Sequence, residues 1–258
     1  MTKPSRFVFL DDLSGHDPFL RTQTAKLANF VDSSQSVILA NSEQLTQRLK
    51  DKYLSGLKEG IYPNLDLIVG VGSSGFELAE KLNLQVPIIK ITPYRDKNSD
   101  GTDAILTRSG IPLITEIAES KHLLRVTKNQ LSIGVVDDTV FSGVTLSEIY
   151  AVLRQNFKSL RVLTLTLTSV PIFLQNNLKD SDIQIISALE IRTNAERKGG
   201  LNSVDMKDLV LDDALPLGDG CSIPFMFEEN WMRAWFGRNY NQAMIVCREI
   251  RHFLQNGF

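Results

Sequence analysis

Cysteine and histidine are scarce in this chain of 258 residues. It contains two cysteines, Cys221 and Cys247, and three histidines. A disulfide-stapled scaffold and a zinc module rich in cysteine and histidine are therefore excluded. So few cysteines are typical of a reducing compartment, and we expect a cytoplasmic protein.

Strong charge of one sign and long apolar runs are also missing. The formal net charge is −2, from 28 basic and 30 acidic residues, so no protein-wide positive field attracts nucleic acid. No apolar run approaches the roughly 20 residues that span a bilayer. Asp11 and Asp12 interrupt the first apolar stretch, which argues against a secretory signal. We expect small molecules as partners, rather than nucleic acid or a membrane, and the chain is compatible with a homodimer.

The chain does contain a regular alternation of strand-like and helix-like runs. The central strands are predicted at 65–71, 86–91, 131–136, 161–168 and 183–188. The helices are predicted at 18–31, 42–57, 76–82, 143–157 and 240–254. Strands that alternate with helices imply parallel βαβ units. We therefore predict an α/β fold with a central, mainly parallel sheet flanked by helices.

The strongest chemical signal follows the strand at 131–136. Two carboxylates, Asp137 and Asp138, come first, and Ser142, Gly143 and Thr145 then lead into a helix. A loop that enters a helix presents backbone N–H groups and the positive end of the helix dipole, which suit a phosphate. The two carboxylates can accept hydrogen bonds from sugar hydroxyls and help to hold Mg²⁺ through its waters. The segment therefore suits a phosphate ester of a sugar. The structural alternative is a strand end followed by a helix start.

This segment resembles the motif of the type I phosphoribosyltransferases, which bind 5-phosphoribosyl 1-pyrophosphate (PRPP). That pattern is an apolar strand, two acids, three variable residues, Thr or Ser, Gly, any residue and Thr. The resemblance implies transfer of ribose 5-phosphate to a nitrogenous base or related nucleophile, with Mg²⁺ and release of pyrophosphate. Asp137 and Asp138 would be the catalytic pair that holds the ribose diol and, indirectly, the metal. The implied cradle for the 5-phosphate is Thr139, Val140, Phe141, Ser142, Gly143, Val144 and Thr145.

The resemblance extends upstream, where a Gly/Ser-rich segment follows the strand at 65–71. This segment resembles the loop of the family that binds pyrophosphate through backbone N–H groups. It consists of Val71, Gly72, Ser73, Ser74 and Gly75. Many members carry a basic residue followed by Gly-Gly there, and this chain has Ser-Ser-Gly. An ordinary connection between a strand and a helix is the structural alternative.

A third resemblance concerns the long, initially polar segment 93–130, which falls where the family has its flexible catalytic loop. Tyr94, Arg95 and Lys97 are its candidate phosphate contacts, with a solvated charged turn as the alternative. We expect residues 61–192 to form the phosphoribosyltransferase-like core. Residues 1–60 would pack on it as an extension, and residues 193–258 would end in a helix. Together the two additions would form the hood that chooses the acceptor base in this family.

Three further interpretations stay open. A non-catalytic, nucleotide-binding relative is compatible with Ser73-Ser74 and with Phe141, which stands where hypoxanthine/guanine-type members carry an acid. An interaction protein is compatible with the aromatic stretch 225–236, although that spacing favours a core. The pair Asp11-Asp12 could indicate a haloacid-dehalogenase-like site, but that family has Asp-x-Asp, so a simple strand end is favoured.

Overall fold

The computed structural model divides the chain into two compact units. Unit 1 comprises residues 1–44 and 191–258, and unit 2 comprises residues 45–190. The division falls inside the first turn of α2 (Ser42–Lys58), whereas the sequence placed a boundary near residue 60. The structure describes residues 5–13, 15, 17–31, 35–97, 103–107, 131–140, 143–157, 159–171, 174, 183–191, 203–211, 215–218 and 221–256.

Unit 2 is built on a five-stranded sheet in which every neighbouring pair of strands is parallel. In chain order the strands are β3 (Leu67–Val71), β4 (Ile88–Ile91), β7 (Leu131–Val140), β8 (Leu160–Ser169) and β9 (Gln184–Glu190). Their order in the sheet is β4-β3-β7-β8-β9, which places β7 in the centre. The predicted α/β fold with a parallel, helix-flanked sheet is confirmed.

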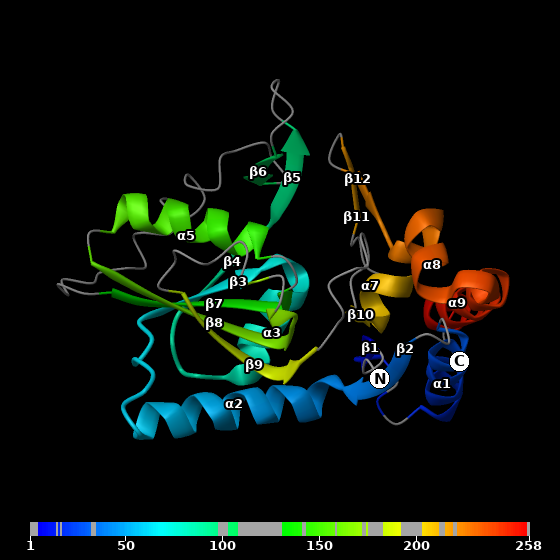
Figure 1. The fold of residues 1–258 in the computed structure, drawn as a ribbon, viewed down its shortest axis with the longest axis horizontal. Helices are drawn as coiled ribbons and strands as arrows, with labels where there is room; N and C mark the ends of the chain where they lie inside the picture. The colour runs from blue at the N-terminus through cyan, green and yellow to red at the C-terminus, as the bar shows by residue number, and fades with distance from the viewer. Residues whose placement is uncertain are drawn as a thin grey trace. The chain divides into compact units, whose positions relative to one another are not determined.

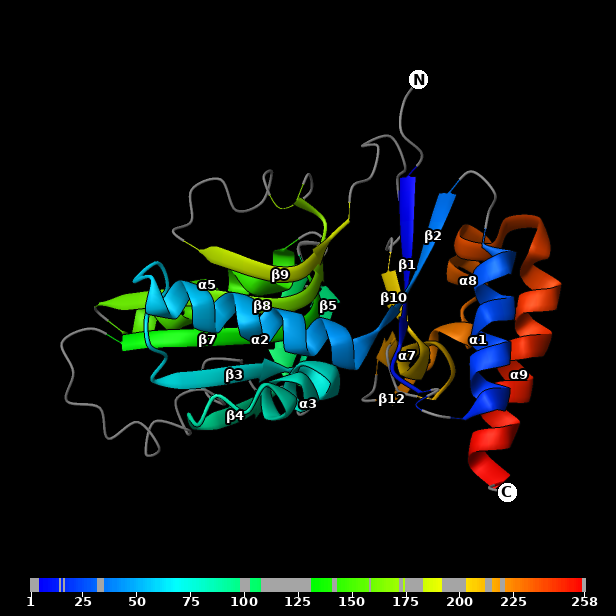
Figure 2. The same cartoon turned by 90° about the horizontal axis from the view of Figure 1, so that it is seen from below.

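Helices cover both faces of this sheet (Figures 1 and 2). The amphipathic α5 (Val144–Asn156) lies on one face, where Ile149 and Leu153 join a buried cluster with Ile133 and Val135 of β7. The opposite face carries α3 (Gly72–Leu82) and α2. Strands buried on both faces read as continuous apolar runs, which explains why the central strands could be located from the sequence.

The described parts of segment 93–130 form a two-stranded antiparallel ribbon. It pairs β5 (Pro93–Lys97) with β6 (Asp103–Thr107). The backbone of the candidate residues Tyr94, Arg95 and Lys97 therefore lies in a strand. Their side chains lie outside the described structure, as do residues 108–130.

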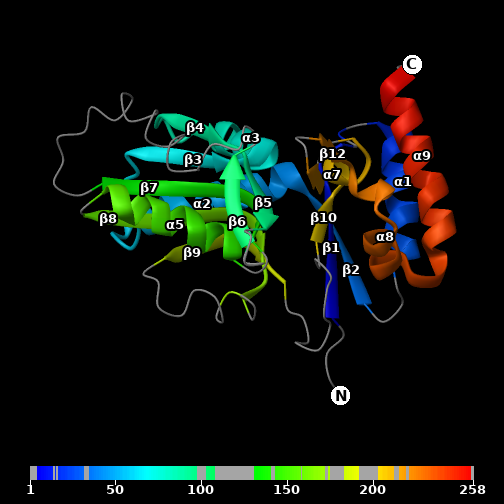
Figure 3. The ribbon, with the colours of Figure 1, turned by 90° about the horizontal axis from the view of Figure 1, so that it is seen from above.

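Unit 1 has its own parallel sheet, with the order β10-β1-β2. These strands are β1 (Ser5–Asp11), β2 (Gln35–Asn41) and β10 (Ser203–Asp205). The helices of unit 1 are α1 (Pro18–Phe30), α7 (Met206–Val210), α8 (Glu229–Phe236) and α9 (Tyr240–Asn256), with short 3-10 turns at Phe225–Phe227 and Gly237–Asn239. A two-stranded ribbon pairs β11 (Leu215–Gly218) with β12 (Cys221–Ile223). Figure 3 shows α1 and α9 side by side, and Gln23 of α1 donates a hydrogen bond of 2.8 Å to Glu249 of α9.

The aromatic stretch 225–236 mainly forms the core of unit 1. Trp235 and Phe236 are buried, and the ring of Trp235 meets that of Phe7 in β1 at a centroid distance of 6.2 Å. Phe225 packs against Trp235 at 5.2 Å. The core interpretation of this stretch is thus correct, although Phe227 is exposed. Of the helices in the described residues, none is both long enough and apolar enough to cross a bilayer.

Candidate functional site

The predicted acidic pair lies in the central strand of unit 2. β7 runs on to Val140, so the strand predicted to stop at Val136 is four residues too short. The extension follows from β8, which pairs Asp137 with Thr166 and Thr139 with Thr168 and so continues the ladder through the polar residues. Asp137, Asp138 and Thr139 are half-buried, in contrast to the buried residues before them. The carboxylates therefore stand at the carboxyl end of the sheet, where open α/β folds bind ligands.

Hydroxyl groups from β8 support this end of β7. The Thr139 hydroxyl donates to Oδ2 of Asp138 at 3.2 Å, and it lies 2.9 Å from the hydroxyl of Thr168. Because the single proton of Thr139 points to the carboxylate, Thr168 must be the donor in the second bond. The Thr166 hydroxyl lies 3.0 Å from the carbonyl oxygen of Asp138 and 2.9 Å from that of Thr168. A chain of hydroxyls thus orients the Asp138 carboxylate.

The β8 threonines were missed as site residues. Thr164, Thr166 and Thr168 are all fully buried. Their spacing of two residues places them on one face of the strand, and this alternation identified a strand without indicating what the hydroxyls contact. A buried run of threonines at the carboxyl end of a parallel strand is the signal that would have found them, because buried hydroxyls need partners.

The predicted phosphate cradle continues from β7 into α5. Thr139 and Val140 are the last residues of β7, and α5 begins at Val144. Gly143 precedes α5 with a φ of +74°, a left-handed conformation that favours glycine. As a glycine, Gly143 has no side chain with which to cap α5, and the N-terminus of a helix suits an anion. Val144 and Thr145 lie in its first turn. Phe141 and Ser142 lie outside the described residues.

The predicted pyrophosphate segment is the end of β3 and the first turn of α3. Val71 ends β3, and α3 begins at Gly72, so Ser73 and Ser74 are helical rather than part of a loop. The N-cap residue of α3, Val71, makes no side-chain cap hydrogen bond. The backbone N–H groups of this turn therefore point from a helix end, an arrangement that suits an anion.

Gly75 places this helix turn directly against the acidic segment. A Cβ atom at position 75 would lie 2.4 Å from the carbonyl oxygen of Val136 and 3.2 Å from the Cα of Asp137. Only glycine permits this approach. The structure therefore brings together two segments that are some 60 residues apart in the printed sequence: the first turn of α3 and the acidic end of β7.

The donor set at this edge fits a hydrated Mg²⁺ ion. Asp137 and Asp138 provide half-buried carboxylates, and Thr139 provides a hydroxyl. Mg²⁺ prefers such oxygen ligands and usually keeps several waters. Both aspartates could hold the ion through those waters while accepting hydrogen bonds from a ligand.

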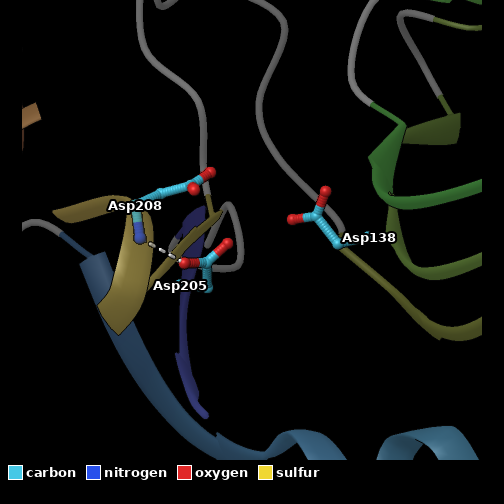
Figure 4. Close-up of side chains that lie close together, drawn as sticks. All are labelled: Asp138, Asp205 and Asp208. Atoms are coloured by element: carbon cyan, nitrogen blue, oxygen red, sulfur yellow. Dashed lines mark hydrogen bonds between the residues drawn. The ribbon is translucent and has the colours of Figure 1, made fainter. Parts of the chain in front are cut away.

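Unit 1 also contains two adjacent aspartates, Asp11 at the end of β1 and Asp12 directly after it, but their surroundings differ. Oδ1 of Asp12 accepts hydrogen bonds from the backbone N–H groups of Met206 and Lys207, at 3.0 and 3.2 Å. Desolvation raises the pKa of Asp12 from 3.8 to about 6, despite the opposing charge of Lys207 and those hydrogen bonds. Met206 and Lys207 begin α7, and Figure 4 shows a second cap on that helix: the Asp205 carboxylate accepts a hydrogen bond of 2.7 Å from the backbone N–H of Asp208. Asp12 therefore helps to fix α7, and Asp11 is the last residue of β1, in agreement with the strand-end interpretation.

Comparison with known proteins finds solved structures with a similar fold. No protein-family model matches the chain, and no curated protein does. Among solved structures, a protein from Neisseria gonorrhoeae with bound ppGpp is 19% identical over 59% of this chain and 82% of its own, with a TM-score of 0.44. A purine phosphoribosyltransferase from Pyrococcus horikoshii is 18% identical over 60% and 94%, with a TM-score of 0.35. An adenine phosphoribosyltransferase from Trypanosoma brucei, solved with AMP, pyrophosphate and ribose-5-phosphate, is 13% identical over 61% and 73%, with a TM-score of 0.38.

Proposed function

We propose that this protein binds PRPP with Mg²⁺ and transfers ribose 5-phosphate to a nitrogenous base or related nucleophile. The observation that carries the proposal is the juxtaposition at the end of β7. Two half-buried carboxylates are followed by a glycine-led helix, and the first turn of α3 packs against the backbone of Val136 and Asp137. This arrangement offers hydrogen-bond acceptors for a sugar diol between two helix ends that suit phosphates.

Each segment has a distinct role in this proposal. Asp137 and Asp138 accept hydrogen bonds from the two ribose hydroxyls, and the Thr139–Thr168 bond keeps the Asp138 carboxylate in place. Residues 139–145 surround the 5-phosphate, and residues 71–75 face the pyrophosphate. In the reaction, the bond from C1 to the pyrophosphate oxygen breaks and its electron pair leaves with pyrophosphate. A nitrogen lone pair of the acceptor forms the new bond to C1, and that nitrogen releases its proton to water.

Catalysis of this kind depends mainly on position and charge. The transition state at C1 is oxocarbenium-like, so aligned groups and fixed dipoles supply most of the rate enhancement. Mg²⁺, when bound, neutralises charge on the leaving pyrophosphate. The half-buried aspartates carry negative charge close to the developing positive charge of the ribose ring.

A second candidate is a non-catalytic protein that binds a nucleotide or a ribose 5-phosphate ligand. The observation that favours it is the first turn of α3, because positions 71–75 contain no basic side chain. Such a protein would bind ligands without turnover. Release of pyrophosphate from PRPP in the presence of a panel of bases separates the two candidates.

The proposal is tested by calorimetric titration of the full chain with PRPP and Mg²⁺. We expect the double variant Asp137→Asn plus Asp138→Asn to bind PRPP about 100-fold more weakly or worse, since hydrogen bonds to charged groups contribute about 1.5–3 kcal/mol each. Asp12→Asn is the matched control, because it removes a carboxylate from the other strand-end pair. A wild-type protein that does not bind PRPP, or a double variant that binds equally well, would contradict the proposal.

A further inference from the structure

The segment that faces the pyrophosphate in the proposed function lacks a cation. Residues 71–75 offer backbone N–H groups and the hydroxyls of Ser73 and Ser74, but no positive side chain. Pyrophosphate carries several negative charges, and a helix end contributes only about half a unit of positive charge. A cation from elsewhere in the fold would make this subsite electrostatically complete.

In the part of the chain that the structure describes, a lysine lies at this turn. Lys90 lies in β4, the edge strand of the sheet, in register with Gly70 of β3. Its Nζ donates a hydrogen bond of 3.0 Å to Oγ of Ser73, in the first turn of α3. The Lys90 side chain is therefore directed toward the N-terminal end of α3. In the sequence, however, Lys90 follows the C-terminal end of that helix.

An aromatic contact supports this position of the lysine. Nζ of Lys90 lies 5.7 Å from the centroid of the Phe76 ring, in the next turn of α3. Cation–π contact at this range is attractive, and long side chains commonly lay their apolar stems along such surfaces. Phe76 and Ser73 together hold the ammonium group at the start of α3. The residue remains exposed, so its charge is accessible to a ligand.

We propose that Lys90 supplies the positive charge of the pyrophosphate subsite. The inference rests on the proposed function and refines it, because it removes the main observation that favours a non-catalytic protein. An ammonium group has three N–H donors. One of them contacts Ser73, and the others are directed to pyrophosphate oxygens when PRPP binds. Lys90 of β4 thus provides the positive charge that many phosphoribosyltransferases carry in the segment equivalent to residues 71–75.

The test separates pyrophosphate-bearing ligands from ligands that lack pyrophosphate. We expect Lys90→Gln in the full chain to weaken the binding of PRPP and of Mg²⁺-pyrophosphate about 10- to 100-fold, the range for hydrogen bonds to a charged group. Binding of ribose 5-phosphate should stay unchanged, because that ligand does not reach the first turn of α3. Lys90→Arg keeps the charge and should retain most of the affinity for both pyrophosphate-bearing ligands.

Lys81→Gln is the matched control, since Lys81 is an exposed lysine in the last turn of the same helix. It should change none of these affinities. Equal weakening of ribose 5-phosphate and PRPP by Lys90→Gln would overturn the inference, and so would unchanged binding of PRPP. Wild-type protein that binds Mg²⁺-pyrophosphate in a Lys90-dependent way, but not PRPP, would overturn the proposed function and leave the role of Lys90 intact. Wild-type protein that binds neither would overturn both.

Discussion

The two units of this chain contain the same short pattern in different settings. In each, the apolar part of a strand in a parallel sheet is followed by adjacent aspartates. Asp11 is the last residue of β1 and Asp12 follows it, whereas Asp137 and Asp138 lie within β7, which continues to Val140. In unit 1, the Asp12 carboxylate accepts from two backbone N–H groups of α7, and desolvation raises its pKa to about 6. In unit 2, the pair is half-buried and Asp138 accepts from a threonine hydroxyl.

The difference shows that an acidic pair at a strand end is not in itself a site. Whether such a pair stabilises the fold or is available to a ligand depends on where its hydrogen-bond donors come from. Asp12 is engaged by the backbone of residues 206 and 207, nearly 200 positions further along the chain, and this stabilises the fold. Gly143 stands five positions after Asp138 and leads into α5, and in the proposed function the backbone N–H groups of that helix start are the donors for a ligand.

The largest effect is expected for Gly75→Ala in unit 2. A methyl group there would meet the Val136 carbonyl oxygen at 2.4 Å, so we expect a destabilisation of about 2–3 kcal/mol, at the upper end for overpacking. Helix propensity alone predicts the opposite sign, since alanine is favoured over glycine by about 1 kcal/mol. Hydrogen–deuterium exchange of peptides from β3 and β7 measures the effect, with peptides from α9 as an internal reference. Ser74→Ala is the control, and slower exchange in Gly75→Ala would contradict the contact.

Much of unit 2 could be predicted from the sequence because its chemistry is local. Buried parallel strands are apolar along their whole length, and the motif at Asp137–Asp138 is contiguous with the helix that it precedes. The predicted errors are local too. The polar residues after Val136 predict the end of a strand, but pairing with β8 extends that strand to Val140. Serine and glycine have low helix propensity, so the sequence predicts a loop at Ser73 and Ser74, but both lie in the first turn of α3.

The rest of the site depends on register between strands, which the sequence does not display. Thr168 contacts Thr139 because β7 and β8 pair those two residues. Lys90 reaches Ser73 because β4 pairs Lys90 with Gly70. In unit 1 the hydrogen-bond donors to Asp12 are equally remote in the sequence. The sequence pattern therefore favours a structural role for Asp12 but does not identify the residues that it contacts.

A smaller effect is expected at Asp12 in unit 1, with a characteristic dependence on pH. Because its pKa is raised from 3.8 to about 6, the native state holds this proton more tightly than the unfolded state. The stability that this contributes is therefore full below pH 3.8 and is lost as the pH rises to about 6. Asp12→Asn should remove this part of the pH dependence while its amide oxygen still accepts from α7. Asp12→Ala should also remove this pH dependence and should be about 1–3 kcal/mol less stable than Asp12→Asn, since backbone donors lose their acceptor.

Tryptophan fluorescence during denaturation is the suitable measurement, because both tryptophans, Trp231 and Trp235, lie in α8 of unit 1. Asp11→Asn serves as the control at the neighbouring carboxylate. A variant Asp12→Asn that keeps the wild-type slope between pH 3.8 and 6 would show that another group titrates there. Weaker PRPP binding by Asp12→Asn would remove the contrast between the two acidic pairs.

The smallest effect is expected from a comparison of two threonines on one strand of unit 2, β8. Thr168 and Thr164 are both buried in β8, but Thr168 bonds to Thr139 whereas the Thr164 hydroxyl has no hydrogen-bond partner among the described residues. Thr168→Val should weaken PRPP binding about 2- to 10-fold, the net value of one hydrogen bond, because the Asp138 carboxylate loses its support. Thr164→Val should leave affinity unchanged and raise stability by about 1 kcal/mol, because an unsatisfied buried hydroxyl is removed. Calorimetric titration and thermal denaturation of both variants make this comparison, and equal affinities would place the hydroxyl chain outside the binding function.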